Sequence, residues 1–127
     1  MHFSRPIWPV VFLTALLTFS GCGETANDAY QRGMAEYKNG EHAKAINAFT
    51  KAIRRDPDHA KAYHKRGETY YWKGEHDKAI ADCSEAIRLN PEYAEAYYIR
   101  GFAYREKKES EKAEADLAKA KELGYEE

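Results

Sequence analysis

Two patterns of apolar residues divide the chain. Residues 7–19 form an unbroken run of thirteen uncharged, mostly apolar residues, IWPVVFLTALLTF. From residue 26 onward, apolar and small residues instead recur at every third or fourth position, which is the spacing of one face of an amphipathic helix. Glycine and proline interrupt this second pattern at regular intervals. It predicts six helices, near residues 27–39, 42–55, 60–73, 76–89, 94–107 and 110–123.

The helical part repeats itself with a period of 34 residues. Gly33, Gly67 and Gly101 fall on this period. Several alanines do so as well, at 45, 79 and 113 and again at 52, 86 and 120. Three units, 26–59, 60–93 and 94–127, account for every residue after residue 25. A fixed period of this length is the sequence signature of a solenoid built from stacked units.

The recurring small residues predict how each unit folds. Glycine inside a helix costs about 0.5–1 kcal/mol relative to alanine, so Gly33 and its equivalents predict close contact between two helices, with Ala45 and its equivalents as the opposing surface. Gly40 and Gly74 should end the first helices in the left-handed conformation. Lys108 replaces the third such glycine, which predicts the most strained turn there. Proline at 57 and 91 should stop the second helices.

These residues resemble the tetratricopeptide repeat (TPR). The second unit carries the family's residue types at the family's spacings, at Tyr63, Gly67, Tyr70, Gly74, Ala79, Ala86 and Pro91. The third unit matches at most of these positions, and the first departs at Ala29 and Glu36, where the family has aromatic residues. The resemblance implies an all-α, right-handed TPR superhelix of three antiparallel helix pairs.

The resemblance also implies a binding surface, because the first helices of TPR units line a concave groove. Their groove positions here are Asn27, Tyr30, Met34, Tyr37 and Lys38 in the first unit, Lys61, His64, Glu68, Tyr71 and Trp72 in the second, and Glu95, Tyr98, Phe102, Arg105 and Glu106 in the third. Aromatic residues and methionine are enriched in protein interfaces. The expected ligand is a peptide or a partner protein.

One TPR subtype holds the carboxylates of chaperone C-termini with a clamp of lysine, asparagine and arginine. The corresponding positions here hold Tyr30, Met34, Lys65, Glu95 and Ile99, so the clamp is absent. Basic and acidic residues are mixed along the groove. This favours a peptide that is apolar or carries both charges.

The N-terminal run has the features of an export signal. Arg5 precedes it, and it is shorter than the roughly 20 residues that span a bilayer. The residues that follow, Phe19-Ser20-Gly21-Cys22, resemble the lipobox of bacterial lipoproteins. The resemblance implies a signal peptide over 1–21, lipidation of Cys22, and a tether over 22–25 that reaches about 10–15 Å.

A bacterial lipoprotein signal also predicts where the protein resides. We expect export and attachment to the bacterial membrane through the lipid. Gly23 rather than aspartate follows the cysteine, which favours the outer membrane facing the periplasm if the cell is Gram-negative.

Composition and spacing exclude several classes of function. A net charge of −1 without a basic run argues against nucleic acid as a partner. Two cysteines cannot form a zinc site alone, and no histidine pair has metal-ligand spacing, so neither a metal nor a cofactor is expected. Cys83 should be a buried apolar residue, and His42 and His76 should face solvent. With no catalytic constellation visible, the protein is expected not to be an enzyme.

Charged residues also follow the period. Arg32, Arg66 and Arg100 precede the three glycines, while Asp82 and Asp116 recur on the second helices and Ala48 breaks their series. This predicts ion pairs between helices, within a unit or between units, that set the register of the stack. Two functions remain open. One is an envelope adaptor that binds a partner in the groove, and the other is a structural lipoprotein that associates with copies of itself.

Overall fold

The computed structural model describes residues 23–126, which form six helices and, within that range, no strand. The helices are α1 (Ala26–Lys38), α2 (His42–Arg55), α3 (Ala60–Trp72), α4 (His76–Leu89), α5 (Ala94–Glu106) and α6 (Ser110–Glu122). All six predicted helices are confirmed, with ends that differ from the prediction by one residue at most. The signal peptide and Cys22 lie outside the described residues.

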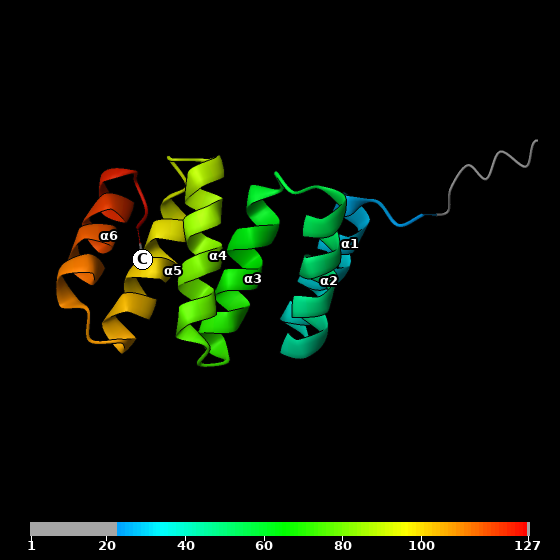
Figure 1. The fold of residues 1–127 in the computed structure, drawn as a ribbon, viewed down its shortest axis with the longest axis horizontal. Coiled ribbons are helices and arrows are strands. Elements are labelled where there is room, and N and C mark those ends of the chain that lie inside the picture. Colours follow the sequence, from blue (N-terminus) through cyan, green and yellow to red (C-terminus); the bar gives the residue numbers. More distant parts are fainter. Residues whose placement is uncertain (1–22, 127) are drawn as a thin grey trace, which may run out of the picture.

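The helices form three antiparallel hairpins that stand in a row (Figure 1). Each hairpin pairs consecutive helices, α1 with α2, α3 with α4 and α5 with α6. The second helix of one hairpin packs on the first helix of the next, and the first helices also contact one another along the row. The first helices therefore make a continuous inner layer, and this layer carries the predicted groove positions.

Small residues set the distance between the two helices of each hairpin. A Cβ atom on Gly33 would lie 2.6 Å from the Phe49 ring, and one on Gly67 would lie 2.9 Å from the sulfur of Cys83. One on Gly101 would lie 2.9 Å from Leu117. The predicted close contact between the two helices of each hairpin is confirmed.

The surface that opposes these glycines differs in part from the prediction. The nearest side chains belong to the position occupied by Phe49, Cys83 and Leu117, one turn beyond the predicted alanines. Ala79 and Ala113 contribute carbonyl oxygens at 3.2 and 3.3 Å. The alanines are buried beside the contact, where a larger side chain would push the helices apart.

The turns between paired helices share one geometry. Gly40 and Gly74 have φ of +74° and +79°, and Lys108 has φ of +62° at the equivalent position. In the first turn the Gly40 amide donates to the Tyr37 carbonyl and the Glu41 amide donates to the Glu36 carbonyl, the hydrogen bonds of a Schellman cap. Lys108 is the only non-glycine residue with positive φ between residues 23 and 126. The third turn therefore carries the predicted backbone strain.

The periodic arginines join helices both within a unit and between units. Arg66 on α3 makes two hydrogen bonds to Asp82 on α4, at 2.7 and 2.8 Å, and a third to Thr50 on α2, at 3.0 Å. Arg100 repeats the arrangement with Asp116, at 2.6 and 2.8 Å, and with Ser84, at 3.1 Å. One guanidinium thus fixes the register of three helices at each of the two junctions.

Two smaller predictions about the core have different outcomes. Cys83 is fully buried, and burial raises the pKa of its thiol, so the residue is the predicted apolar one. His42 and His76 were predicted to face solvent, which is wrong, because both are half-buried. Their rings pack on Tyr37 and Tyr71, at centroid distances of 6.0 and 5.6 Å, since the last turn of each first helix covers the start of the second.

Candidate partner-binding groove

The predicted groove residues of the second and third units form a row of aromatic rings. The ring of Tyr71 lies 5.3 Å from that of Trp72 and 6.4 Å from that of Phe102. Phe102 lies 4.6 Å from Tyr98, and Tyr98 lies 4.4 Å from Tyr125. This aromatic row, Trp72–Tyr71–Phe102–Tyr98–Tyr125, therefore runs from the end of α3 across α5 to the segment that follows α6.

Trp72 is the most exposed member of the row. Its side chain is 60% exposed, and it is the only exposed large apolar residue between residues 23 and 126. A tryptophan left in water at the edge of an aromatic row provides apolar area that a partner can bury.

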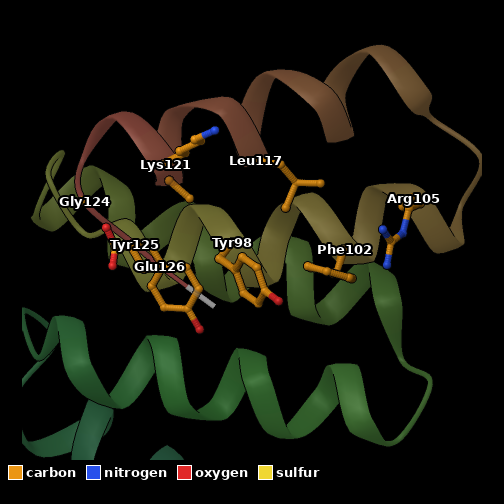
Figure 2. Close-up of a pocket in the computed structure, with 9 residues that line it drawn as sticks. Tyr98, Phe102, Arg105, Leu117, Lys121, Gly124, Tyr125 and Glu126 are labelled. Carbon is orange, nitrogen blue, oxygen red and sulfur yellow. The ribbon is translucent and has the colours of Figure 1, made fainter.

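A hollow of about 550 Å³ opens at the other end of the aromatic row (Figure 2). Tyr98 and Phe102 line it from α5, Leu117 and Lys121 from α6, and Tyr125 from the last described segment. Figure 2 shows the rings of Tyr98 and Tyr125 side by side at its edge. The hollow has room for one or two side chains of a ligand.

The hollow combines an apolar floor with charged edges. The Arg105 guanidinium lies 4.0 Å from the centroid of the Phe102 ring, a stacked arrangement that keeps a positive charge beside an apolar surface. Lys121 adds a second positive charge, and Glu126 adds a negative one. This arrangement suits a ligand with an apolar side chain next to an acidic group.

The groove residues of the first unit take part in contacts between units. The Tyr37 hydroxyl donates to Oε1 of Glu68 at 3.0 Å, and Lys65 lies 2.6 Å from Oε2 of the same carboxylate. Burial, with Glu68 beside it, raises the pKa of Tyr37 to about 12. Tyr30 packs on Phe49 and His59 at 5.8 and 5.0 Å. These side chains hold α1 against α3, and only part of their surface faces the groove.

His64 occupies a groove position but is only 4% exposed. Its ring lies 4.9 Å from that of Tyr93, and its Nδ1 is 3.2 Å from the Tyr93 hydroxyl. Burial lowers the pKa of His64 to about 4, so the imidazole is neutral near pH 7. Covered by Tyr93, His64 does not contribute to the exposed groove surface in this structure.

The remaining predicted positions differ in exposure. Lys38, Lys61, Glu95 and Arg105 are exposed on the first helices, as are Asn27 and Glu106, while Met34 is half-buried. The structure therefore brings together Tyr71, Trp72, Tyr98, Phe102 and Arg105.

Six of the residues that line the hollow were absent from the predicted site, among them Leu117, Lys121 and Tyr125. Leu117 and Lys121 belong to a second helix, and Tyr125 follows the last helix, whereas the family's groove positions were taken from first helices alone. The sequence did offer a signal, because Tyr125 stands where the other two units have proline. That exchange places an aromatic ring where it can pack on Tyr98.

Neither a metal cluster nor a membrane span is found in the part of the chain that the structure describes. No three His, Cys, Asp or Glu residues within 23–126 are placed to hold a metal ion. None of the six helices is long and apolar enough to cross a bilayer.

Comparison with known families identifies the fold. A sequence model of the tetratricopeptide repeat matches residues 30–92, and a second model with the same description matches residues 83–115. Together they cover both junctions between the three hairpins. The chain belongs to the tetratricopeptide repeat family.

Solved TPR structures resemble the chain closely. The first TPR domain of Spaghetti (RPAP3), bound to the HSP90 peptide SRMEEVD, is 29% identical with a TM-score of 0.78, and the match covers 79% of each chain. MamA is 35% identical with a TM-score of 0.75, and the match covers 79% of this chain and 58% of the MamA chain. The TPR2B domain of yeast Sti1, in a complex with pHsp70, is 28% identical with a TM-score of 0.75, over 77% and 78% of the two chains. No curated protein sequence matches the chain.

The relatives solved with an HSP90 peptide and with pHsp70 show that TPR domains serve protein interaction. The residues at the clamp positions of this chain are nevertheless different in kind. Ile99 is only 8% exposed, Glu95 is acidic, and the Lys65 ammonium is held by Glu68. A clamp for two carboxylates is therefore absent from the groove.

Proposed function

We propose that the protein is a membrane-anchored TPR adaptor of the bacterial envelope, which binds a peptide or a segment of a partner protein on the aromatic row. The observation that carries this proposal is Trp72, 60% exposed at the edge of that row. The hollow beside Tyr98 and Phe102 provides depth for a side chain, and Arg105 provides a positive charge next to it. An apolar segment with an acidic residue fits this surface best.

Cross-linking in the native cell, followed by affinity purification, tests the binding surface. The paired change Trp72→Ala/Tyr98→Ala should lose most of a partner that the wild-type protein retains, because aromatic anchors carry a large share of binding energy. The matched control is Tyr70→Ala/Tyr104→Ala, which removes two half-buried tyrosines outside the aromatic row. Tyr70 contacts Arg66 and Lys78, and Tyr104 contacts Arg100 and Lys112. Circular dichroism of each variant separates loss of binding from loss of fold.

The outcomes of this experiment are distinct. A partner lost only in the groove variant supports the adaptor. An unchanged set of partners in the groove variant would contradict it. Recovery of further copies of the chain alone would favour the self-associating structural lipoprotein instead.

The anchor is tested at Cys22, which lies outside the described residues. Replacing the thiol in Cys22→Ser removes the atom that would carry the lipid. The bacterial lipoprotein modification would give Cys22 three acyl chains, which bind firmly to a bilayer because each buried CH₂ contributes about 0.8 kcal/mol. We therefore expect the variant to leave the membrane fraction when it is washed with high salt, which screens charge contacts, and to fail to incorporate labelled fatty acid. Labelling equal to wild type would show that lipidation of Cys22 is wrong.

A further inference from the structure

A second hollow, of about 580 Å³, lies on the first hairpin and is lined by basic residues. Arg32 contributes from α1, and Lys51, Arg54 and Arg55 contribute from α2. Its remaining lining residues are Asn47 and Thr50, which are uncharged. We call these four basic side chains the α1–α2 basic patch. It stands apart from the aromatic row, which begins at the end of α3.

The basic patch is a departure of the first unit from the 34-residue pattern. Arg66 and Arg100 are tied to Asp82 and Asp116, with side chains only 17% and 19% exposed. Ala48 stands in the place of that aspartate in the first unit, and the Arg32 side chain is 45% exposed.

The α2 helix also carries more basic residues than α4 and α6 at the positions that line the hollow. Lys51, Arg54 and Arg55 are all basic, whereas the second unit keeps only Arg88 at these positions and the third keeps only Lys119. Arg54 and Arg55 are exposed and have no ion pair within residues 23–126. Two positive charges that are unpaired in this range therefore line one hollow on the first hairpin, although the whole chain has a net charge of −1.

The described chain starts directly on this patch. A Cβ atom added to Gly23 would lie 3.9 Å from Nη1 of Arg55. The carboxylate of Glu24 lies 2.5 Å from both Arg32 and Lys51, and its hydrogen bond with Lys51 lowers its pKa. The negative charge of Glu24 offsets one of the four positive charges. Glu36, 3.9 Å from Arg32, partly offsets a second.

The chain enters α1 immediately afterwards. Thr25 caps the helix, accepting a hydrogen bond from the Asp28 amide while the Asp28 carboxylate accepts one from the Thr25 amide. Residues 24 and 25 are thus bound to the folded hairpin, so Gly23 is the one residue between Cys22 and these contacts. A lipid on Cys22 would hold the basic patch at the surface of the bilayer.

We propose that the α1–α2 basic patch binds the headgroups of anionic phospholipids in the membrane that holds the protein. The proposal rests on the anchored location proposed above. Basic side chains near a bilayer surface attract anionic lipids, and such contacts act together with a lipid anchor as a second attachment. The patch orients the stack, with the first hairpin on the membrane and the aromatic row away from it.

Vesicle sedimentation tests this inference without the acyl chains. The protein is the full chain with Cys22→Ser, whose apolar N-terminal run is common to every variant compared. It should bind vesicles of phosphatidylcholine mixed with phosphatidylglycerol at least tenfold more tightly than vesicles of phosphatidylcholine alone. The preference should fall as salt is added, because ions screen exposed charges.

Matched variants locate the effect. Arg54→Gln/Arg55→Gln should reduce the affinity for phosphatidylglycerol vesicles by about tenfold or more, since each basic residue near the surface contributes roughly fivefold. Lys73→Gln/Arg88→Gln removes the same charge from exposed positions of the second unit and should leave the affinity within about twofold.

Three results would overturn the inference. They are equal binding to the two kinds of vesicle, equal loss in the two variants, and tighter binding of an oligonucleotide or an acidic peptide to the patch than of phosphatidylglycerol vesicles. A negative vesicle result would not bear on the proposed lipid anchor, because the Cys22→Ser protein used in that experiment carries no lipid. Failure of acylation in the cell would instead contradict the proposed anchor and leave the vesicle result standing.

Discussion

Asp82→Ala is expected to lower the free energy of unfolding by about 3 kcal/mol, which is a large part of the stability of a domain of this size. Asp82 accepts two hydrogen bonds from Arg66, and the two side chains are 9% and 17% exposed. Without the carboxylate, the guanidinium remains between α2, α3 and α4 with Thr50 as its one polar partner. Losing one member of a buried pair is costly because the remaining charge is still desolvated.

The first unit supplies the control for this prediction. Arg32 occupies the same repeat position, but its side chain is 45% exposed and its partners are Glu24 and Glu36. Arg32→Gln should therefore cost less than about 1 kcal/mol, as exposed ion pairs usually do. Urea denaturation followed by circular dichroism measures both variants. Similar losses in the two would contradict the role assigned to the Arg66–Asp82 pair.

The second large effect is a pH dependence that comes from His64. Burial lowers the pKa of its imidazole to about 4, against an ordinary value near 6.5. Lys65 acts in the same direction, while Glu68 and Glu95 oppose the shift. As the pH falls below about 6.5, His64 binds a proton in the unfolded chain but not in the folded one. The unfolded state is therefore stabilised relative to the folded state.

The stabilisation by neutral His64 is present above pH 6.5 and is lost between about pH 6.5 and pH 4. The free energy of unfolding should fall by roughly 2–3 kcal/mol over this range from this residue. Denaturation of wild type and His64→Gln at a series of pH values measures the effect. Carboxylates titrate in both proteins, so the difference between their profiles isolates His64. Parallel profiles would show that the histidine is not held neutral by burial.

Local features of the fold could be predicted from the sequence because each depends on residues that are close in the chain or repeat with it. Gly40 and Gly74 marked the left-handed turns, and Lys108 marked the strained one. Gly33 and its equivalents marked the close contact within each hairpin, because a glycine in a helix needs a compensating contact. The side chain that fills that contact was placed one turn too early, since spacing alone does not fix the offset between two antiparallel helices.

The aromatic surface was predicted less completely. Its positions were taken from the family's five groove positions on each first helix, as if each of them were open to a ligand. His64 shows why this fails, since the chain that leads into the next unit brings Tyr93 over it. Tyr125 covers Tyr98 in a related way, after the last helix. Contacts of this kind depend on the segment that follows each unit, and a list of groove positions contains no information about that segment.

The arginine junctions have a consequence for the length of the protein. Each uses an arginine from one unit, an aspartate from the same unit and a hydroxyl from the preceding unit, and the two junctions are chemically alike. A duplicate of residues 60–93 inserted after residue 93 would find a matching hydroxyl in Ser84 and would offer its own copy of Ser84 to Arg100. The basic patch and the hollow beside Tyr98 would then move one unit further apart without any change in either. Evolution or a designer can thus adjust the separation between these two surfaces in steps of one hairpin.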